Sequence, residues 1–216
     1  MNPTQRRENI EIGPLALLGE LALPPHASGL VVFAHGSGSS RSSPRNVWVA
    51  NALHARGVGT VLFDLLTESE AVVRANVFDI GLLGARMCEA LDWIGARRDL
   101  AALRIGLFGA STGSAAALVA AATRPASIAA VVSRGGRPDL AGEYLPRVMA
   151  ATLLIVGGED HTVLQLNRAA MRALNCVKRL EIVPGATHLF EEPGTLESVA
   201  ELAAGWFVRH LAPAAA

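Results

Sequence analysis

Ser111 lies between two glycines, in the sequence Gly-Ala-Ser-Thr-Gly of residues 109–113. A serine hydroxyl becomes a strong nucleophile when a histidine removes its proton and an acid orients that histidine. The pattern G-x-S-x-G has this meaning when it joins a strand to a helix, because the sharp turn then exposes the serine. The same five residues could otherwise form an ordinary glycine-rich turn, so the surrounding sequence has to decide.

The residues around Ser111 match the required context. The apolar run 105–108 predicts a strand before it, and the alanine-rich run 112–123 predicts a helix after it. Side chains at positions 109 and 113 would collide with neighbouring backbone in such a turn, which explains the glycines. The turn also brings the hydroxyl close to a helix N-terminus, where free N–H groups favour developing negative charge.

An acid and a histidine follow later in the chain, each directly after an apolar run. Asp160 comes after residues 153–156, and His188 comes after residues 180–183. The order serine, acid, histidine is the one that accompanies this type of serine turn. A single such residue is usually structural, but three in this order predict Ser111 as nucleophile, Asp160 as orienting acid and His188 as general base.

Other residues near these positions fit the catalytic roles less well. Glu159 adjoins Asp160 and is expected to point elsewhere, and His161 comes before the strand and helix that the base should follow. His26, His54 and His210 have no evident partners and are expected to be surface or packing residues.

Stabilising the negative oxygen of an acyl-transfer intermediate requires two backbone N–H groups. One is expected from Thr112, the residue after the nucleophile, and the other from Ser37 in the Gly- and Ser-rich loop 35–39. His35 and Gly36 in that loop are candidate substrate-binding residues, with His35 expected mainly to shape the loop. A phosphate-binding loop is the alternative, although neither G-x-x-x-x-G-K-[ST] nor G-x-G-x-x-G occurs.

Short apolar runs alternate with amphipathic stretches along the chain. Predicted strands cover residues 30–34, 58–63, 105–108, 129–133, 153–156 and 180–183, and predicted helices cover residues 47–56, 80–97, 112–123, 164–174 and 196–211. This alternation predicts an α/β fold with a mainly parallel, doubly wound sheet and helices on both faces. Residues 9–23 could add two antiparallel strands with a turn at Gly13 and Pro14. We expect a single domain over residues 1–216.

Parallel strands end at one edge of the sheet, where ligands bind. His35, Asp64, Ser111, Arg134, Asp160 and His188 all follow predicted strands and should therefore gather at that edge. Asp64 is expected to hydrogen-bond within its loop.

The composition excludes several other classes of function. Nineteen basic residues balance nineteen acidic ones, so no net charge attracts nucleic acid or an anionic membrane. No apolar run approaches the length of a membrane span, and residues 1–12 do not resemble a signal peptide. Cys88 and Cys176 are expected to be buried thiols, in keeping with a cytoplasmic location. No metal-binding motif or cofactor is expected, and the protein is expected to be a monomer or homodimer.

With these residues in place, the chain resembles α/β-hydrolases of the dienelactone hydrolase-like group from about residue 30 to residue 211. The resemblance includes the serine turn, the three candidate catalytic residues and the segments 33–38, 64–67 and 133–138. Dienelactone hydrolases proper resemble the chain but use a cysteine nucleophile and a glutamate in the first loop. This sequence has Ser111 and no glutamate between His35 and Ser43, which favours an ordinary carboxylic ester as substrate.

The predicted function is hydrolysis of small or aryl carboxylic esters through an acyl-enzyme. About twenty residues separate two of the predicted strands, 129–133 and 153–156, which leaves room for a minimal cap and predicts an open, shallow pocket. Arg134 and Arg137 should lie at its rim, either binding a substrate oxygen or, as we favour, pairing with Asp139 or Glu143. Thioesterase, amidase, acyltransferase and lactone hydrolase activities share the same machinery. A non-catalytic binding protein is the alternative of a different class.

Overall fold

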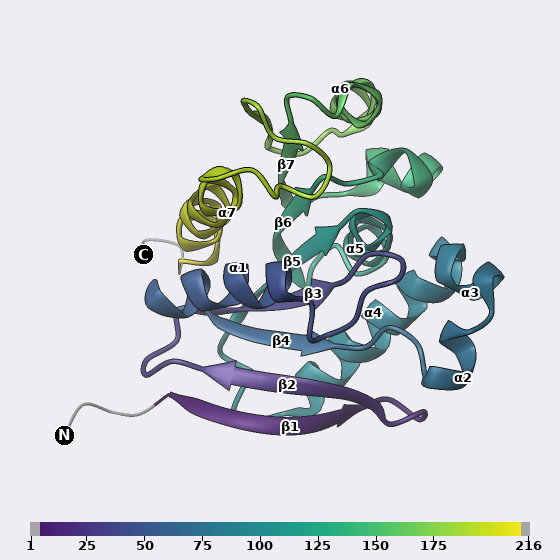
Figure 1. Cartoon of the computed structure of the whole chain (residues 1–216). Coiled ribbons are helices and arrows are strands. Elements are labelled where there is room, and N and C mark those ends of the chain that lie inside the picture. The colour runs from purple at the N-terminus through teal and green to yellow at the C-terminus, as the bar shows by residue number, and fades with distance from the viewer. Residues whose placement is uncertain (1–4, 213–216) are drawn as a thin grey trace.

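The computed structural model describes residues 5–212, and residues 1–4 and 213–216 of the predicted domain lie outside the described part (Figure 1). Its sheet has eight strands in the order β1-β2-β4-β3-β5-β6-β7-β8. These strands are β1 (Arg6–Ile12), β2 (Leu17–Leu23), β3 (Gly29–Ala34), β4 (Gly59–Phe63), β5 (Arg104–Ala110), β6 (Ile128–Arg134), β7 (Ala151–Gly157) and β8 (Lys178–Val183). The strands from β4 to β8 in this order pair in parallel, and β2 pairs antiparallel with both β1 and β4.

Helices connect the parallel strands, as the alternation in the sequence predicts. They are α1 (Pro44–Ala55), α2 (Glu68–Ala71), α3 (Arg74–Phe78), α4 (Ile80–Ala96), α5 (Thr112–Thr123), α6 (His161–Ala173) and α7 (Thr195–Leu211), with a 3₁₀ helix, η1 (Pro138–Arg147), before β7. The six predicted parallel strands, the five predicted helices and the hairpin of β1 and β2 are all present, with shifted ends. The short helices α2 and α3 were not predicted.

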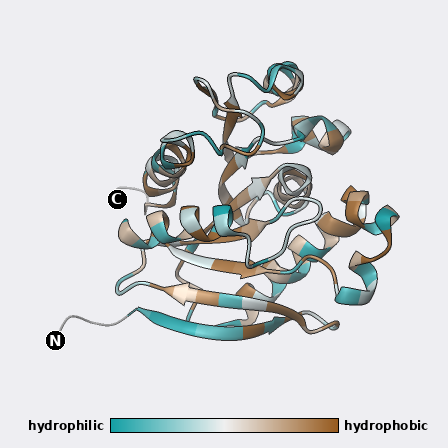
Figure 2. Cartoon of the chain, in the orientation of Figure 1, coloured by the Kyte–Doolittle hydropathy of each residue, from teal (hydrophilic) through white to brown (hydrophobic). Residues whose placement is uncertain are grey.

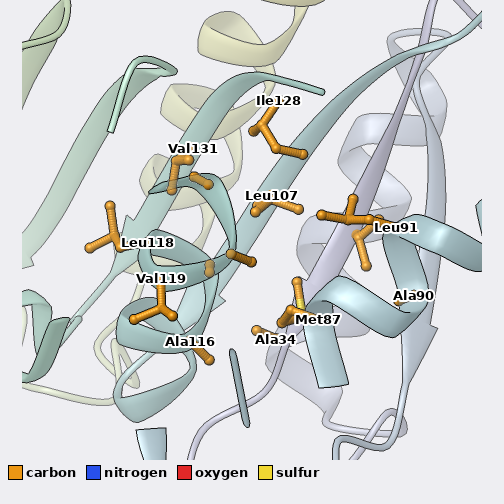
Figure 3. Close-up of a cluster of buried hydrophobic side chains, with 14 of the residues drawn as sticks. Ala34, Met87, Ala90, Leu91, Leu107, Ala116, Leu118, Val119, Ile128 and Val131 are labelled. Atoms are coloured by element: carbon orange, nitrogen blue, oxygen red, sulfur yellow. The ribbon is translucent and has the colours of Figure 1, made fainter. Parts of the chain in front are cut away.

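Each central strand is apolar on both faces because helices cover both. In β3, Leu30 and Val32 belong to a core with α4 and α5, whereas Val31 and Phe33 belong to a second core with α1 and α7. This alternation follows from the two-residue period of a strand. Figure 3 shows part of the first core, to which Met87 of α4 and Ala116 of α5 both belong.

Hydropathy decreases toward the first edge of the sheet. Figure 2 shows that β1 is largely hydrophilic, whereas β5, β6 and β7 are hydrophobic. β1 carries a polar residue at most positions that face solvent, and only Ile10 and Ile12 are buried. Within residues 5–212, none of the helices is long and apolar enough to cross a membrane.

The predicted site residues end or follow strands whose carboxyl ends share one edge of the sheet. The helices α2 and α3 also lie at this edge, beyond the end of β4 (Figure 1). η1 is the only element between β6 and β7, so the cap at that position is minimal, as expected.

Candidate active site

Ser111 forms the turn between β5, which ends at Ala110, and α5, which begins at Thr112. Its backbone has φ 50° and ψ −121°, a strained conformation for a residue other than glycine. A Cβ atom at Gly109 would lie 2.4 Å from the Cα atom of Ser114, and one at Gly113 would lie 2.2 Å from the carbonyl oxygen of Ala34. Glycine is therefore required on both sides of the serine, as the sequence indicated.

Asp160 and His188 are brought together although 28 residues separate them. The Nδ1 atom of His188 lies 2.6 Å from Oδ2 of Asp160, and the two side chains are 39% and 13% exposed. Asp160 is also the N-cap residue of α6, where an aspartate usually accepts a hydrogen bond from the first helical turn. Its side chain makes no such bond. The carboxylate is instead directed to the imidazole.

Backbone hydrogen bonds join the loops that carry these two residues. The N–H of Gly158 donates to the carbonyl of Val183 at 2.9 Å, and the N–H of Glu159 donates to Ala186 at 3.0 Å. Glu159 itself points away, with its carboxylate 3.9 Å from the exposed ring of His161. Main-chain hydrogen bonds therefore join the two loops that carry the candidate pair.

Ser111 contacts the last residue of β6, and His188 contacts the residue that follows it. The N–H of Ser111 donates to the carbonyl of Arg134 at 3.2 Å. The next residue is Gly135, where a Cβ atom would lie 3.6 Å from Nδ1 of His188. Within residues 5–212 the Ser111 hydroxyl makes no side-chain hydrogen bond to His188. Catalytic hydrogen bonds often shorten only when substrate is bound.

The loop after β3 lies against the serine turn. A Cβ atom at Gly36 would lie 3.1 Å from the Cβ atom of Ser111. The N–H of Ser37, predicted to bind the negative oxygen, donates to the hydroxyl of Thr112 at 3.0 Å. Thr112 is itself buried. The Ser37 N–H is thus placed beside the turn but is shared with a side chain, and its role stays a prediction.

His35 and Asp64 shape the loops of the site. The Nε2 atom of His35 accepts the N–H of Leu65 at 3.1 Å, so Nδ1 donates to the carbonyl of Gly36 at 3.0 Å. Burial lowers the pKa of His35, which is consistent with a neutral ring. Asp64 accepts the backbone N–H of Arg41 at 2.7 Å and pairs with its guanidinium. Both residues therefore link the ends of β3 and β4.

A cavity of about 320 Å³ opens beside Thr112 and the 35–41 loop. Its apolar wall comes from the residues after β4, from the segment that holds α2 and α3 and from the first turn of α4, and consists of Leu65, Leu66, Ala71, Val77 and Leu83. This wall was not predicted from the sequence. One signal was present: Thr67 and Glu70 form a capping box at the start of α2. The residues that line this cavity include Thr112 but none of Ser111, Asp160 and His188, and the hollows along β8 and α7 and beside β1 are also lined by none of these three.

The two arginines expected at the rim differ. Arg137 donates two hydrogen bonds to Asp139, from Nε at 2.9 Å and from Nη2 at 2.8 Å, which is the ion pair that the sequence favoured. Arg134 is 7% exposed and pairs with neither Asp139 nor Glu143. The expected rim position of Arg134 is wrong. Arg134 is the last residue of β6, and its side chain is buried on the face of the sheet that α1 and α7 cover, near the ring of Phe190.

Among residues 5–212, no three histidine, cysteine, aspartate or glutamate side chains are grouped to hold a metal ion. Cys88 and Cys176 are free and half-buried, rather than fully buried as expected.

Comparison with known proteins agrees with this fold. The crystal structure of a dienelactone hydrolase from Anabaena variabilis is 52% identical, with a TM-score of 0.92 over 98% of this chain and 100% of that chain. The esterase Est1E from Butyrivibrio proteoclasticus is 17% identical, with a TM-score of 0.77 over 94% of this chain and 98% of that chain, and shares the fold.

A Mycobacterium tuberculosis protein that is provisionally named a phosphoribosyl transferase is 55% identical over 97% of this chain. The match covers 48% of that protein, so the chain spans about half the length of this curated relative. The profile of the dienelactone hydrolase family matches residues 64–208, from the end of β4 into α7. With its eight-stranded, mostly parallel sheet, the chain belongs to the dienelactone hydrolase family and has the α/β-hydrolase fold.

Proposed function

We propose that the chain is a serine hydrolase of carboxylic esters, with Ser111 as nucleophile, His188 as general base and Asp160 as orienting acid. The observation that carries the proposal is the 2.6 Å contact of Asp160 with His188, made beside a strained serine turn. The carboxylate makes this contact and no capping bond to α6, as expected of an acid that orients a histidine.

In this proposal Nε2 of His188 removes the Ser111 proton as the oxygen attacks the ester carbonyl. Asp160 accepts the Nδ1 proton and so fixes the tautomer in which Nε2 is free to act as a base. The N–H groups of Thr112 and Ser37 stabilise the negative oxygen of the tetrahedral intermediate. The alcohol leaves with a proton from His188, and water then releases the acid by the same steps in reverse.

The cavity supports a preference for small acyl or aryl groups. Its volume of about 320 Å³ is at the lower end of ligand pockets, and its wall is largely apolar. Thioesters, amides and lactones present a similar carbonyl and remain alternatives for the same residues. The transferase name belongs to a relative that this chain matches over about half its length, and no observation at this site favours phosphoribosyl transfer.

The first experiment combines activity with labelling by a fluorophosphonate, which requires an activated serine. We expect wild-type protein to hydrolyse short p-nitrophenyl esters and to be labelled, and Ser111→Ala to lose up to ~10⁶ in kcat and all of the label. Ser127→Ala, at an exposed serine before β6, is the matched control and should keep both. A Ser111→Ala protein with a tenth of wild-type activity would refute the proposal, and an unlabelled wild-type protein would favour a binding role.

A further inference from the structure

The segment of residues 134–137, which ends β6 and leads to η1, holds the backbone of Ser111 on both sides. The N–H of Ser111 donates to the carbonyl of Arg134 at 3.2 Å, and the N–H of Arg137 donates to the carbonyl of Ser111 at 3.1 Å. Ser111 has a positive φ of 50°, and a strained residue keeps such a conformation only when its surroundings impose it. The 134–137 segment therefore helps to impose the conformation of the serine turn.

The same segment also contacts the elements that carry the other two candidate catalytic residues. A Cβ atom at Gly135 would lie 3.1 Å from the carbonyl oxygen of His188. The N–H of Gly135 donates at 2.8 Å to the carbonyl of Ile155 in β7, the strand that leads to Asp160. The 134–137 segment is thus a common support for the serine turn, the histidine loop and the strand before the acid.

Asn167 of α6 fastens this segment from the side. Its side chain is fully buried. Its Nδ2 atom donates to the carbonyl of Gly136 at 2.9 Å and to the carbonyl of Val163, one turn earlier in α6, at 2.8 Å. Because both acceptors are carbonyl oxygens, the amide nitrogen has to face them. α6 begins directly after Asp160, so this side chain ties the helix that follows the acid to the segment that holds Ser111.

Burying the amide of Asn167 has a cost that only one of its two bonds explains. Its Oδ1 atom is buried without a hydrogen-bond partner in the described part of the chain, and an unpaired buried acceptor is unfavourable. The carbonyl of Val163 lies inside a helix, where the backbone already supplies a donor. Gly136 lies outside the helices and strands, and its carbonyl depends on the side chain of Asn167. The bond to Gly136 is therefore the one that the amide is needed for.

Gly136 is packed closely against the elements on either side of the serine turn. A Cβ atom at this position would collide with the side chains of Ser133 in β6 and Ser114 in α5. Ser114 is itself buried, and its hydroxyl donates at 2.8 Å to the carbonyl of Gly109, at the start of the turn. Close-packed interiors transmit a displacement rather than absorb it. A shift of Gly136 would therefore reach the turn through α5 as well as through Arg137.

We propose that Asn167 is a positioning residue for the reaction and holds Ser111 in its reactive orientation through the 134–137 segment. This inference rests on the proposed function and adds to it a side chain that bonds to the backbone of Gly136 and acts on the serine through it. A misplacement of the reacting groups by about 1 Å can slow a reaction roughly 100-fold. Loss of the bond to Gly136 should therefore slow the chemical step and leave substrate binding nearly unchanged.

Asn167→Ser separates the two bonds of the amide. A serine hydroxyl can still bond to the carbonyl four residues earlier in its helix, but it is too short to reach Gly136. We expect kcat on a short p-nitrophenyl ester and the rate of fluorophosphonate labelling to fall together, by roughly 10- to 100-fold, with KM within about twofold of wild type. Asn167→Leu removes both bonds and should show the same loss of kcat with a larger loss of Tm.

The matched control is Thr152→Val, which also removes a buried hydrogen bond. Thr152 is fully buried near the start of β7, and its hydroxyl donates to the carbonyl of Ala150 at 2.9 Å. This variant should lower Tm and leave kcat and the labelling rate unchanged. Wild-type kcat and labelling in Asn167→Ser would overturn the inference, and so would an equal loss of kcat in Thr152→Val.

Hydrogen exchange separates a failure of this inference from a failure of the proposed function, because it requires no activity. Peptides that contain residues 109–113 and 134–137 should exchange faster in Asn167→Ser than in wild type, and no faster in Thr152→Val. Unchanged exchange in Asn167→Ser would overturn the inference whether or not the protein is active. If wild-type protein neither hydrolyses esters nor takes the label, the proposed function is wrong, and faster exchange would still keep Asn167 as the residue that holds the serine turn.

Discussion

The two ends of the sheet differ in how their charged groups are satisfied. At the amino end, Arg97 donates to Glu8 at 2.9 Å and to Asp99 at 2.8 Å, and Arg6 donates to Asp99 at 2.9 Å. These guanidinium groups, Arg97 foremost, hold the pKa values of Glu8 and Asp99 below their ordinary range. The charges there are satisfied within the chain.

At the carboxyl end, several groups lack the partner that their position would normally provide. Ser111 is held at a positive φ, Asp160 does not cap its helix, and Arg134 is buried without an anion. Each of these features costs stability.

The comparison teaches where to look for function in this fold. A network in which every charged group has a partner in the free protein stabilises the fold and needs no ligand. Strained residues and unpaired polar groups are expected at functional sites, where a bound ligand supplies the interactions that the free protein lacks. The expected signature is that changes at the carboxyl end affect activity, whereas changes at the amino end affect stability.

The largest difference is expected between two aspartates at opposite ends. Asp160→Asn should lower kcat about 10⁴-fold with a small change in Tm, because an asparagine stabilises the wrong imidazole tautomer. Asp99→Asn removes a carboxylate from the amino-end network and should lower Tm while leaving kcat unchanged. Steady-state kinetics on a short p-nitrophenyl ester and thermal unfolding provide both readouts. If the Asp99 variant lost as much activity as the Asp160 variant, the contrast between the two ends would be wrong.

A smaller effect is expected from the hydroxyl of Thr112, which accepts the N–H of Ser37 at 3.0 Å. Without it the loop that carries one proposed N–H donor is less fixed, so Thr112→Val should lower kcat about 10- to 100-fold with little change in KM. Thr112→Ser keeps the hydroxyl and should restore most of the activity.

Thr123→Val provides the control for Thr112. It alters the last residue of the same helix, whose hydroxyl bonds to the carbonyl of Val119, and it should not change kcat. Failure of Thr112→Ser to recover activity would assign the effect to packing.

The parts of the fold that the sequence predicted depend on local rules. The run 129–133 is apolar at every position, which already indicates a strand covered on both sides. The need for glycine at 109 and 113 arises from local contacts. A Cβ atom at these positions would collide with Ser114, a few residues away, and with Ala34 in the adjacent strand β3. The pairing of Asp160 with His188 was predictable because parallel strands end at one edge.

The missed features depend on packing between distant segments. Arg134 and Arg137 are three residues apart and near the same acids, so the sequence gives them the same expectation. The strand sends Arg134 toward α1, while Arg137 lies beside Asp139 in the following turn. Similarly, Leu66 and Val77 look like ordinary core residues, and only the placement of α2 and α3 makes them a cavity wall.

The smallest predicted effect concerns His54. This residue is an exception at the amino end, where the charged side chains described above are paired. It was expected to have no partner, yet its Nε2 atom lies 2.8 Å from the hydroxyl of Thr60, while Nδ1 is buried and unpaired. Burial, and secondarily the charge of Arg7, lower the pKa of His54 to about 4 from an ordinary value of 6.5. The unfolded chain therefore takes up a proton at a higher pH than the folded protein does.

Stability from His54 should be fully present above pH 6.5 and should decrease as the pH falls from 6.5 to about 4. His54→Gln removes this titration, so the difference in Tm between wild type and variant should change by a few degrees across that interval and stay constant above it. His26→Gln, at an exposed histidine, is the control and should run parallel to wild type. A constant difference for His54→Gln from pH 7 to pH 4 would mean that this ring is solvated in the folded protein, and the amino end would then contain no unsatisfied histidine to explain.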